Sequence, residues 1–229
     1  MEKSMIFYDN EINTTLGGGM TMFVRPLNYQ PLDILPMKVP DEWVTLDTVN
    51  PNHGKVIGCR FGIPGDRLWV KETWADVNSE YGPAICYKAN GSLQSWRDFS
   101  KVFGPDEGAG PSMDYETYPG NYFMWWEDLL MGHPGHGWRP SVHMPRWASR
   151  ITLEVVNVRV MRVQDITEED AKTAAAPLGR VMGYGHVGMQ SHLEGFIELW
   201  DSRFGKKYPW RKNPWVWITE FKCLTGIEK

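Results

Sequence analysis

The strongest structural signal in the chain is a long alternation of apolar and polar residues at 149–164, SRITLEVVNVRVMRVQ. Ile151, Leu153 and Val155 occupy every second position, and the alternation resumes in the other phase after Val156. This pattern is typical of a strand with one buried face, because successive side chains of a strand point to opposite faces. The change of phase predicts a β-bulge or a bend within the strand.

Two helices and a closing strand are predicted downstream. In DITEEDAKTAAA, Thr167 precedes three acidic residues, as expected for a helix N-cap followed by a negatively charged first turn. SHLEGFIELWDSRFGKKY predicts a helix that ends at Gly205 and carries one apolar stripe, formed by Leu193, Phe196, Ile197, Trp200 and Phe204. NPWVWITEFKC then predicts the last strand.

The remaining segments are less regular. Residues 1–15 predict a short strand followed by a turn or a helix start, and residues 28–55 predict a loop. Pro64-Gly65-Asp66 predicts a turn before a short buried strand. Strands without regular βαβ alternation favour an α+β fold, a small β-barrel with flanking helices. We expect one domain over 1–229, with a long, irregular Gly-, Pro- and Trp-rich insertion at about 76–140.

Charge and cysteine content restrict the functional classes. A net charge of −4 argues against general adhesion to nucleic acid, although a local basic groove remains possible. The three cysteines are far apart and form no CxxC pair, which favours a reduced, cytoplasmic protein. No apolar run approaches the roughly 18 residues of a membrane span, and the first residues do not resemble a signal peptide.

Known cofactor motifs are absent from the sequence. The glycine run in LGGGMTMFVRPL, residues 16–27, has neither the GxxxxGK[ST] nor the GxGxxG pattern, so a tight turn is the better interpretation. His133, His136 and His143 with Cys86 could supply zinc ligands only if the loop between them brings them together. We therefore expect no metal and no cofactor.

Two stretches combine basic and aromatic residues. The arginines and tryptophans of RPSVHMPRWASR, residues 139–150, can bind phosphates and stack on bases. Alternatively, the stretch is a loop anchored by its arginines, with the Trp147 side chain buried in the core. GDRLWVKETWA, residues 65–75, places Lys71 and Thr73 on one strand face and Glu72 on the other. That stretch can line a groove or form a surface ion-pair edge.

These stretches, together with NPWVWITEF, resemble the phage and prophage branch of the ASCH group within the PUA-like superfamily. The resemblance rests on GDRLWVKE, PSVHMPRWASR and NPWVWITEF, and it covers most of residues 14–27, 56–75 and 138–223. It implies a β-barrel with a cleft beside a helix, in a superfamily that handles RNA and modified nucleobases. Some members are N4-acetylcytidine amidohydrolases, and others are reported as nucleases.

The same resemblance implies that the catalytic set has been lost. The family segment resembles LLAGRKTxTRRPL, and alignment on the final Arg-Pro-Leu puts Met20 on the catalytic Lys and Phe23 on the second, catalytic Thr. Ala174 falls on the catalytic Glu of the helix after the long strand. Met, Phe and Ala can neither activate a nucleophile nor protonate a leaving group, so the amidohydrolase reaction is improbable.

Three functional hypotheses follow. The first is a non-catalytic protein of the host-cell cytoplasm that binds a nucleobase, nucleotide, modified nucleoside or RNA, or a host defence or translation protein. Its expected site residues are Thr21, Arg25, Lys71, Thr73, Arg146, Trp147, Ser149 and Arg150. The second is an active hydrolase or ribonuclease that uses Lys71, Glu72 and His143. The third is a phage structural or morphogenetic protein that uses the Trp-rich insertion as an interface.

Overall fold

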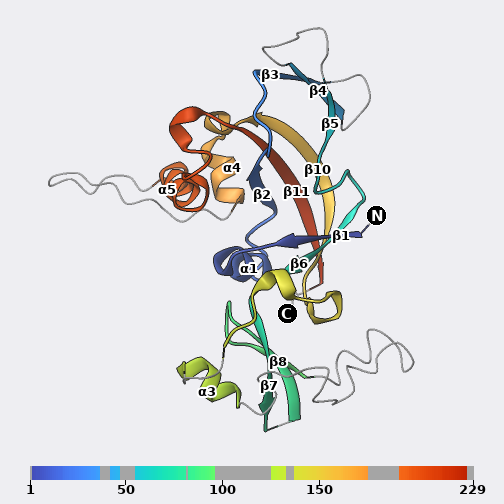
Figure 1. The fold of residues 1–229 in the computed structure, drawn as a ribbon, viewed down its shortest axis with the longest axis vertical. Helices are drawn as coiled ribbons and strands as arrows, with labels where there is room; N and C mark the ends of the chain where they lie inside the picture. Colours follow the sequence, from blue (N-terminus) through green and yellow to red (C-terminus); the bar gives the residue numbers. More distant parts are fainter. Residues whose placement is uncertain are drawn as a thin grey trace, which may run out of the picture. The chain divides into compact units, whose positions relative to one another are not determined.

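The computed structural model describes residues 2–36, 42–46, 55–80, 82–95, 125–132, 137–174 and 191–225, and it has a mixed α+β fold. The chain forms two compact units. The first unit comprises Met1–Lys3, Thr14–Leu68 and Thr152–Lys229, and the second comprises Ser4–Asn13 and Trp69–Ile151. Each unit is described by itself below, and Figure 1 gives the element labels.

The largest sheet contains five strands in the order β1-β6-β10-β11-β2. Its strands are β1 (Glu2–Ile6), β6 (Arg67–Lys71), β10 (Thr152–Arg162), β11 (Trp215–Thr225) and β2 (Met22–Pro26). β10 and β11 pair antiparallel, with a register shift between Val155 and Asn157. The strand predicted at 149–164 and its change of phase are therefore confirmed, and so is the predicted last strand.

The described sheet is open, because its order begins at β1 and ends at β2. The α+β class is thus established, whereas closure of the sheet into a barrel is not shown among the described residues. No helix in these ranges is both long enough and apolar enough to cross a membrane.

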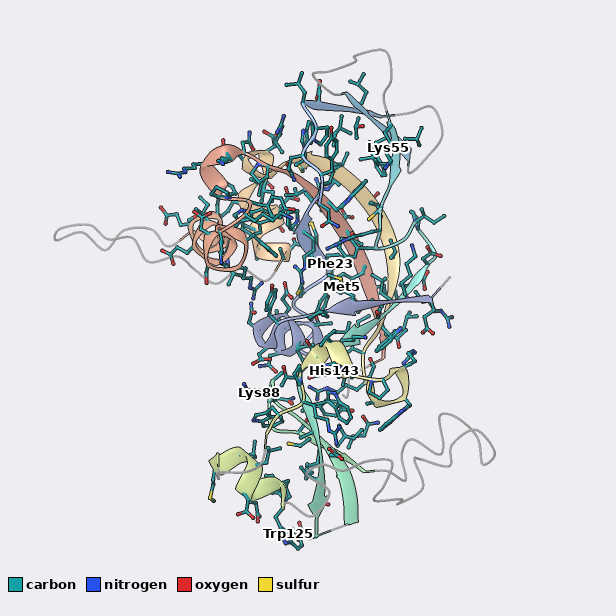
Figure 2. All side chains as sticks on the ribbon, in the orientation of Figure 1. Met5, Phe23, Lys55, Lys88, Trp125 and His143 are labelled. Atoms are coloured by element: carbon teal, nitrogen blue, oxygen red, sulfur yellow. The ribbon has the colours of Figure 1, made fainter. Side chains whose placement is uncertain are left out.

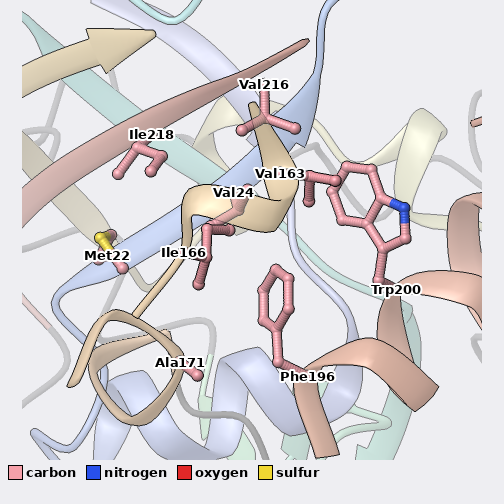
Figure 3. Close-up of a cluster of buried hydrophobic side chains, with 9 residues drawn as sticks. All are labelled: Met22, Val24, Val163, Ile166, Ala171, Phe196, Trp200, Val216 and Ile218. Atoms are coloured by element: carbon pink, nitrogen blue, oxygen red, sulfur yellow. The ribbon is translucent and has the colours of Figure 1, made fainter. Parts of the chain in front are cut away.

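The core of the first unit lies between the sheet and two helices, α4 (Glu168–Thr173) and α5 (His192–Phe204). Figure 3 shows the buried cluster, in which side chains of β2 and β11 face Phe196 and Trp200 of α5. Its members are Met22, Val24, Val163, Ile166, Ala171, Phe196, Trp200, Val216 and Ile218. Phe196 and Trp200 belong to the predicted apolar stripe, so the helix pattern correctly identified the face that packs.

The ends of both helices agree with the sequence predictions. The Thr167 side chain accepts a hydrogen bond from the backbone N–H of Asp170, and the Asp170 carboxylate accepts one in return from the Thr167 N–H, at 3.1 Å each. This capping box satisfies two backbone donors at the start of α4. α5 ends at Phe204, immediately before Gly205.

Residues 28–55 are not simply a loop, which corrects the sequence prediction. A three-stranded antiparallel sheet is formed by β3 (Asp33–Pro36), β4 (Glu42–Leu46) and β5 (Lys55–Gly58). The three strands have only four or five residues each. The Pro, Asp and Asn residues around such short strands dominate the local composition and conceal the period-two pattern.

The second unit contains helix α1 (Asp9–Leu16) in part, and an antiparallel sheet of β7 (Trp74–Ser79), β8 (Gly82–Tyr87) and β9 (Leu93–Ser95). It also contains α3 (Trp126–Met131) and two 3-10 turns, η2 (Ser141–His143) and η3 (Arg146–Ala148). The predicted strand AICYKA corresponds to β8. The insertion expected at 76–140 thus carries regular structure where it is described, while 81, 96–124 and 133–136 lie outside the described residues.

Candidate nucleic-acid interface

Strand β6 and the residues after it divide their side chains between two faces. Trp69, Lys71 and Thr73 are half-buried, whereas Val70 and Glu72 are 1% exposed. The alternation confirms the prediction that Lys71 and Thr73 share a face opposite to Glu72. The two faces have different chemistry.

On the half-buried face, two cations lie beside the indole ring of Trp69. The Lys71 Nζ lies 5.0 Å from the ring centroid, and the Arg146 Cζ lies 5.9 Å from it. The Lys71 ammonium also donates a hydrogen bond to the backbone carbonyl of Val142 in η2, at 3.1 Å. Cation–π attraction at these distances holds both charges close to one aromatic surface. We call Trp69, Lys71 and Arg146 the Trp69 face.

The opposite face is built around an ion pair. The Arg150 guanidinium donates to both carboxylate oxygens of Glu72, at 2.9 and 2.8 Å. Arg150 also donates to Ser92 and Asn90, and its Cζ lies 4.0 Å from the Tyr87 ring centroid. Burial raises the pKa of Glu72, and the Arg150 guanidinium opposes that rise. The guanidinium and the carboxylate therefore neutralise each other's charge and form each other's hydrogen bonds within the second unit.

Trp147 and Ser149 also make internal contacts. The Trp147 ring packs edge-on against Trp74, with the ring centroids 6.0 Å apart. The Ser149 hydroxyl lies 2.7 Å from the Val70 carbonyl oxygen and 3.2 Å from that of Ile151. Together with Arg150, these side chains position the 139–150 loop, as the arginine-anchored interpretation expects. That leaves Arg146 as the predicted loop residue on the Trp69 face.

Thr21 and Arg25 belong to the first unit, so the eight expected site residues are divided between the two units. Thr21 is exposed. Its backbone N–H donates a hydrogen bond to the Thr173 carbonyl at 3.3 Å, and its carbonyl accepts one from the Phe221 N–H at 2.8 Å. The Arg25 side chain is only 6% exposed and donates to the Val24 carbonyl at 3.0 Å.

Met20, Phe23 and Ala174, which align by sequence with the catalytic residues of the family that the chain resembles, are buried or partly buried. Met20 is 2% exposed and Phe23 is 1% exposed. The Phe23 ring contacts Phe61 edge-on at 5.1 Å and Phe221 at 5.9 Å between centroids; Figure 2 labels Phe23 within the first unit. Ala174 is partly buried and packs against the cluster of Figure 3. Apolar packing accounts for all three side chains.

The alternative catalytic set does not converge on one point. Lys71 and Glu72 point to opposite faces, and Glu72 is committed to Arg150. His143 is exposed at the end of η2, one residue after the carbonyl that Lys71 contacts. Lys71 and His143 are thus near neighbours, but the carboxylate that would complete the set is buried on the other side of the strand.

The candidate zinc ligands are only partly described. His133 and His136 lie outside the described residues. Cys86 is buried, and burial raises the pKa of its thiol to about 11, which favours the protonated form that metals do not bind. No group of three His, Cys, Asp or Glu residues suited to a metal ion occurs in the described ranges.

Sequence reasoning missed Trp69 as a site residue, although its signal was present. Trp69, Lys71 and Thr73 follow one another at period two, so the strand assignment already placed the indole beside the lysine. No family model, curated protein or solved structure matches the chain. The geometry of the two units therefore carries the functional inference.

Proposed function

We propose that the chain is a non-catalytic binding protein that takes single-stranded RNA on the Trp69 face. The observation that carries the proposal is one half-buried indole with an ammonium 5.0 Å and a guanidinium 5.9 Å from its centroid. A base can stack on the indole while its flanking phosphates meet the two cations. An exposed histidine, His143, adds a polar group near the same strand face.

The family resemblance supports the same proposal. We assign the chain to the phage-type ASCH group and its fold to the PUA-like barrels, on the strength of GDRLWVKE, PSVHMPRWASR and NPWVWITEF. Each of the first two motifs supplies part of the Trp69 face. Apolar packing at Met20 and Phe23 supports the loss of amidohydrolase chemistry, because neither side chain can take part in proton transfer.

The electrostatic part of the proposal is tested by the salt dependence of RNA binding. Affinity for a fluorescein-labelled single-stranded RNA is measured by anisotropy at several salt concentrations. We expect Lys71→Ala to weaken binding and to lower the slope of log K against log salt by about 1, because one phosphate contact is lost. Lys88→Ala is the matched control, since Lys88 is an exposed lysine of the same unit outside the Trp69 face.

Two results would contradict the proposal. Equal effects of Lys71→Ala and Lys88→Ala would show that binding depends on total charge and not on this face. Release of acetate from N4-acetylcytidine by the native protein would overturn its non-catalytic part and make Lys71 and His143 the first residues to replace.

A further inference from the structure

Two guanidinium groups lie on one aromatic cluster in the first unit. The Arg25 Cζ is 5.5 Å from the Phe23 ring centroid, and the Arg60 Cζ is 4.5 Å from the Phe61 centroid. The two phenyl rings contact each other edge-on, with centroids 5.1 Å apart. Two cations from separate segments, 35 positions apart in the chain, thus share one pair of contacting rings.

The two cations differ in depth. Arg25 is 6% exposed, whereas Arg60 is exposed at the surface. Hydrogen bonds connect Arg60 to Asn28 and, through Asn28, to Tyr208. Arg60 donates a long hydrogen bond, 3.4 Å, to the Asn28 side chain, and the Tyr208 hydroxyl donates to the Asn28 carbonyl at 3.2 Å. One cation of the pair is therefore buried and the other is accessible, and Asn28 connects the accessible one to Tyr208.

The charges of the two arginines act on each other. Partial burial lowers the pKa of Arg60, and the positive charge of Arg25 lowers it further. Burial raises the pKa of the neighbouring Cys59 thiol above its usual value of 9.0, so this group carries no charge near pH 7. Because the positive charge of Arg25 acts on Arg60, an anion bound to the Arg60 guanidinium would be stabilised by both charges.

We propose that Arg25 and Arg60 form a binding site for a phosphate group, in which Arg60 contacts the anion and the buried Arg25 supplies a second positive charge. A phosphate offers more oxygens than a carboxylate, whose two oxygens one bidentate guanidinium already occupies. Arginine's fixed fork matches a tetrahedral oxyanion, and the neighbouring aromatic rings restrict the guanidinium positions. The site uses no residue of the Trp69 face. Phosphate binding here can therefore be tested independently of RNA binding there.

Calorimetric titration with inorganic phosphate at constant ionic strength tests the proposal. We expect native protein to bind phosphate and Arg60→Gln to bind it about tenfold more weakly or worse, because a charge-assisted hydrogen bond is lost. Arg60→Lys keeps the charge without the fork and should fall between the two. Arg211→Gln, which removes another exposed arginine of the same unit, is the control and should bind like native protein.

The source of the phosphate is identified by comparing inorganic phosphate, UMP and uridine. Tighter binding of UMP than of phosphate would identify a nucleotide, and equal binding would identify the free ion. The proposal is overturned if native protein does not bind phosphate, if Arg60→Gln and Arg211→Gln weaken binding equally, or if uridine binds as well as UMP. Circular dichroism of each variant confirms that the fold is retained.

Discussion

Met20 and Phe23 occupy core positions of the first unit. Both side chains are almost completely buried, and Phe23 lies between two other phenyl rings in the first unit. Neighbouring Thr21 is exposed, so the transition from surface to core occurs between adjacent residues. A lysine introduced at position 20 would therefore place its ammonium group at a buried position.

Met20→Lys should destabilise the protein by about 3–5 kcal/mol, the cost of an uncompensated buried charge. Thr21→Lys introduces the same side chain at the exposed neighbouring position and should change stability by less than about 0.5 kcal/mol. Urea denaturation followed by tryptophan fluorescence measures both. Equal stability of the two variants would show that position 20 is open to solvent in solution.

Glu72 illustrates what residue-level reasoning can and cannot predict. The period-two rule correctly placed it opposite Lys71 and Thr73. Its partner Arg150 lies 78 positions away in the sequence, and only the fold brings the two together. A pattern read along one strand cannot predict such a long-range pair, which is why Glu72 remained a candidate acid or base and Arg150 a candidate ligand contact.

At the scale of elements, the start of α5 is joined to α4 by one carboxylate. Glu168 of α4 accepts hydrogen bonds from the Ser191 hydroxyl at 2.6 Å and from the backbone N–H groups of His192 and Leu193 at 2.7 and 2.9 Å. These bonds satisfy donors at a helix N-terminus, where negative charge is favoured. They also lower the pKa of Glu168 below its ordinary value of 4.5, and the Ser191 bond is the largest cause.

The Glu168 contacts predict a pH dependence of stability. Because the pKa is lowered on folding, the contribution is fully present above about pH 4.5, the unfolded value, and is lost as the pH falls through the lower folded value. Glu168→Gln should lower the free energy of unfolding at neutral pH. It should also reduce the loss of that free energy as the pH falls below about 5.

Glu169→Gln is the control for this prediction, because Glu169 is an exposed neighbour in the same turn. Thermal unfolding is compared for the two variants across the acid range. If Glu168→Gln retained the full acid sensitivity of native protein, the carboxylate would not be the group that titrates.

The elements that the sequence predicted correctly are long and have regular hydrophobic patterns. β10, β11 and α5 each have 11 or more residues, so their hydrophobic periods repeat often enough to be recognised. β3, β4, β5 and β9 have three to five residues, and that length spans too few repeats. β3 and β4 are consequently the strands that the sequence assigned to a loop.

At the scale of the whole molecule, the chain carries two basic–aromatic clusters in different units, and each is the basis of one proposal. The Trp69 face belongs to the second unit, and the Arg25–Arg60 pair belongs to the first. A net charge of −4 means that neither site is part of a general basic surface, so each must act through local geometry. Point substitutions in one unit therefore test one site without removing the other.

The structure divides the predicted ligand contacts of the second unit into two groups with different surroundings. Lys71 and Arg146 were predicted as ligand contacts, and the structure places both beside Trp69. Trp147 and Arg150 have the same residue types in the same loop but make internal contacts. Residue type and spacing do not distinguish a side chain that faces a ligand from one that anchors a loop, because that difference depends on the packing of distant strands.

The measurement that tests the central claim most directly is the RNA affinity of Trp69→Ala beside that of Trp125→Ala, by anisotropy in one buffer. Both residues belong to the second unit, and Trp125 is 48% exposed outside the Trp69 face. Loss of one base stack is worth about 1–3 kcal/mol, so Trp69→Ala should bind roughly 5- to 150-fold more weakly while Trp125→Ala binds like native protein. Unchanged affinity of Trp69→Ala, or an equal loss in both variants, would contradict the assignment of RNA binding to the Trp69 face.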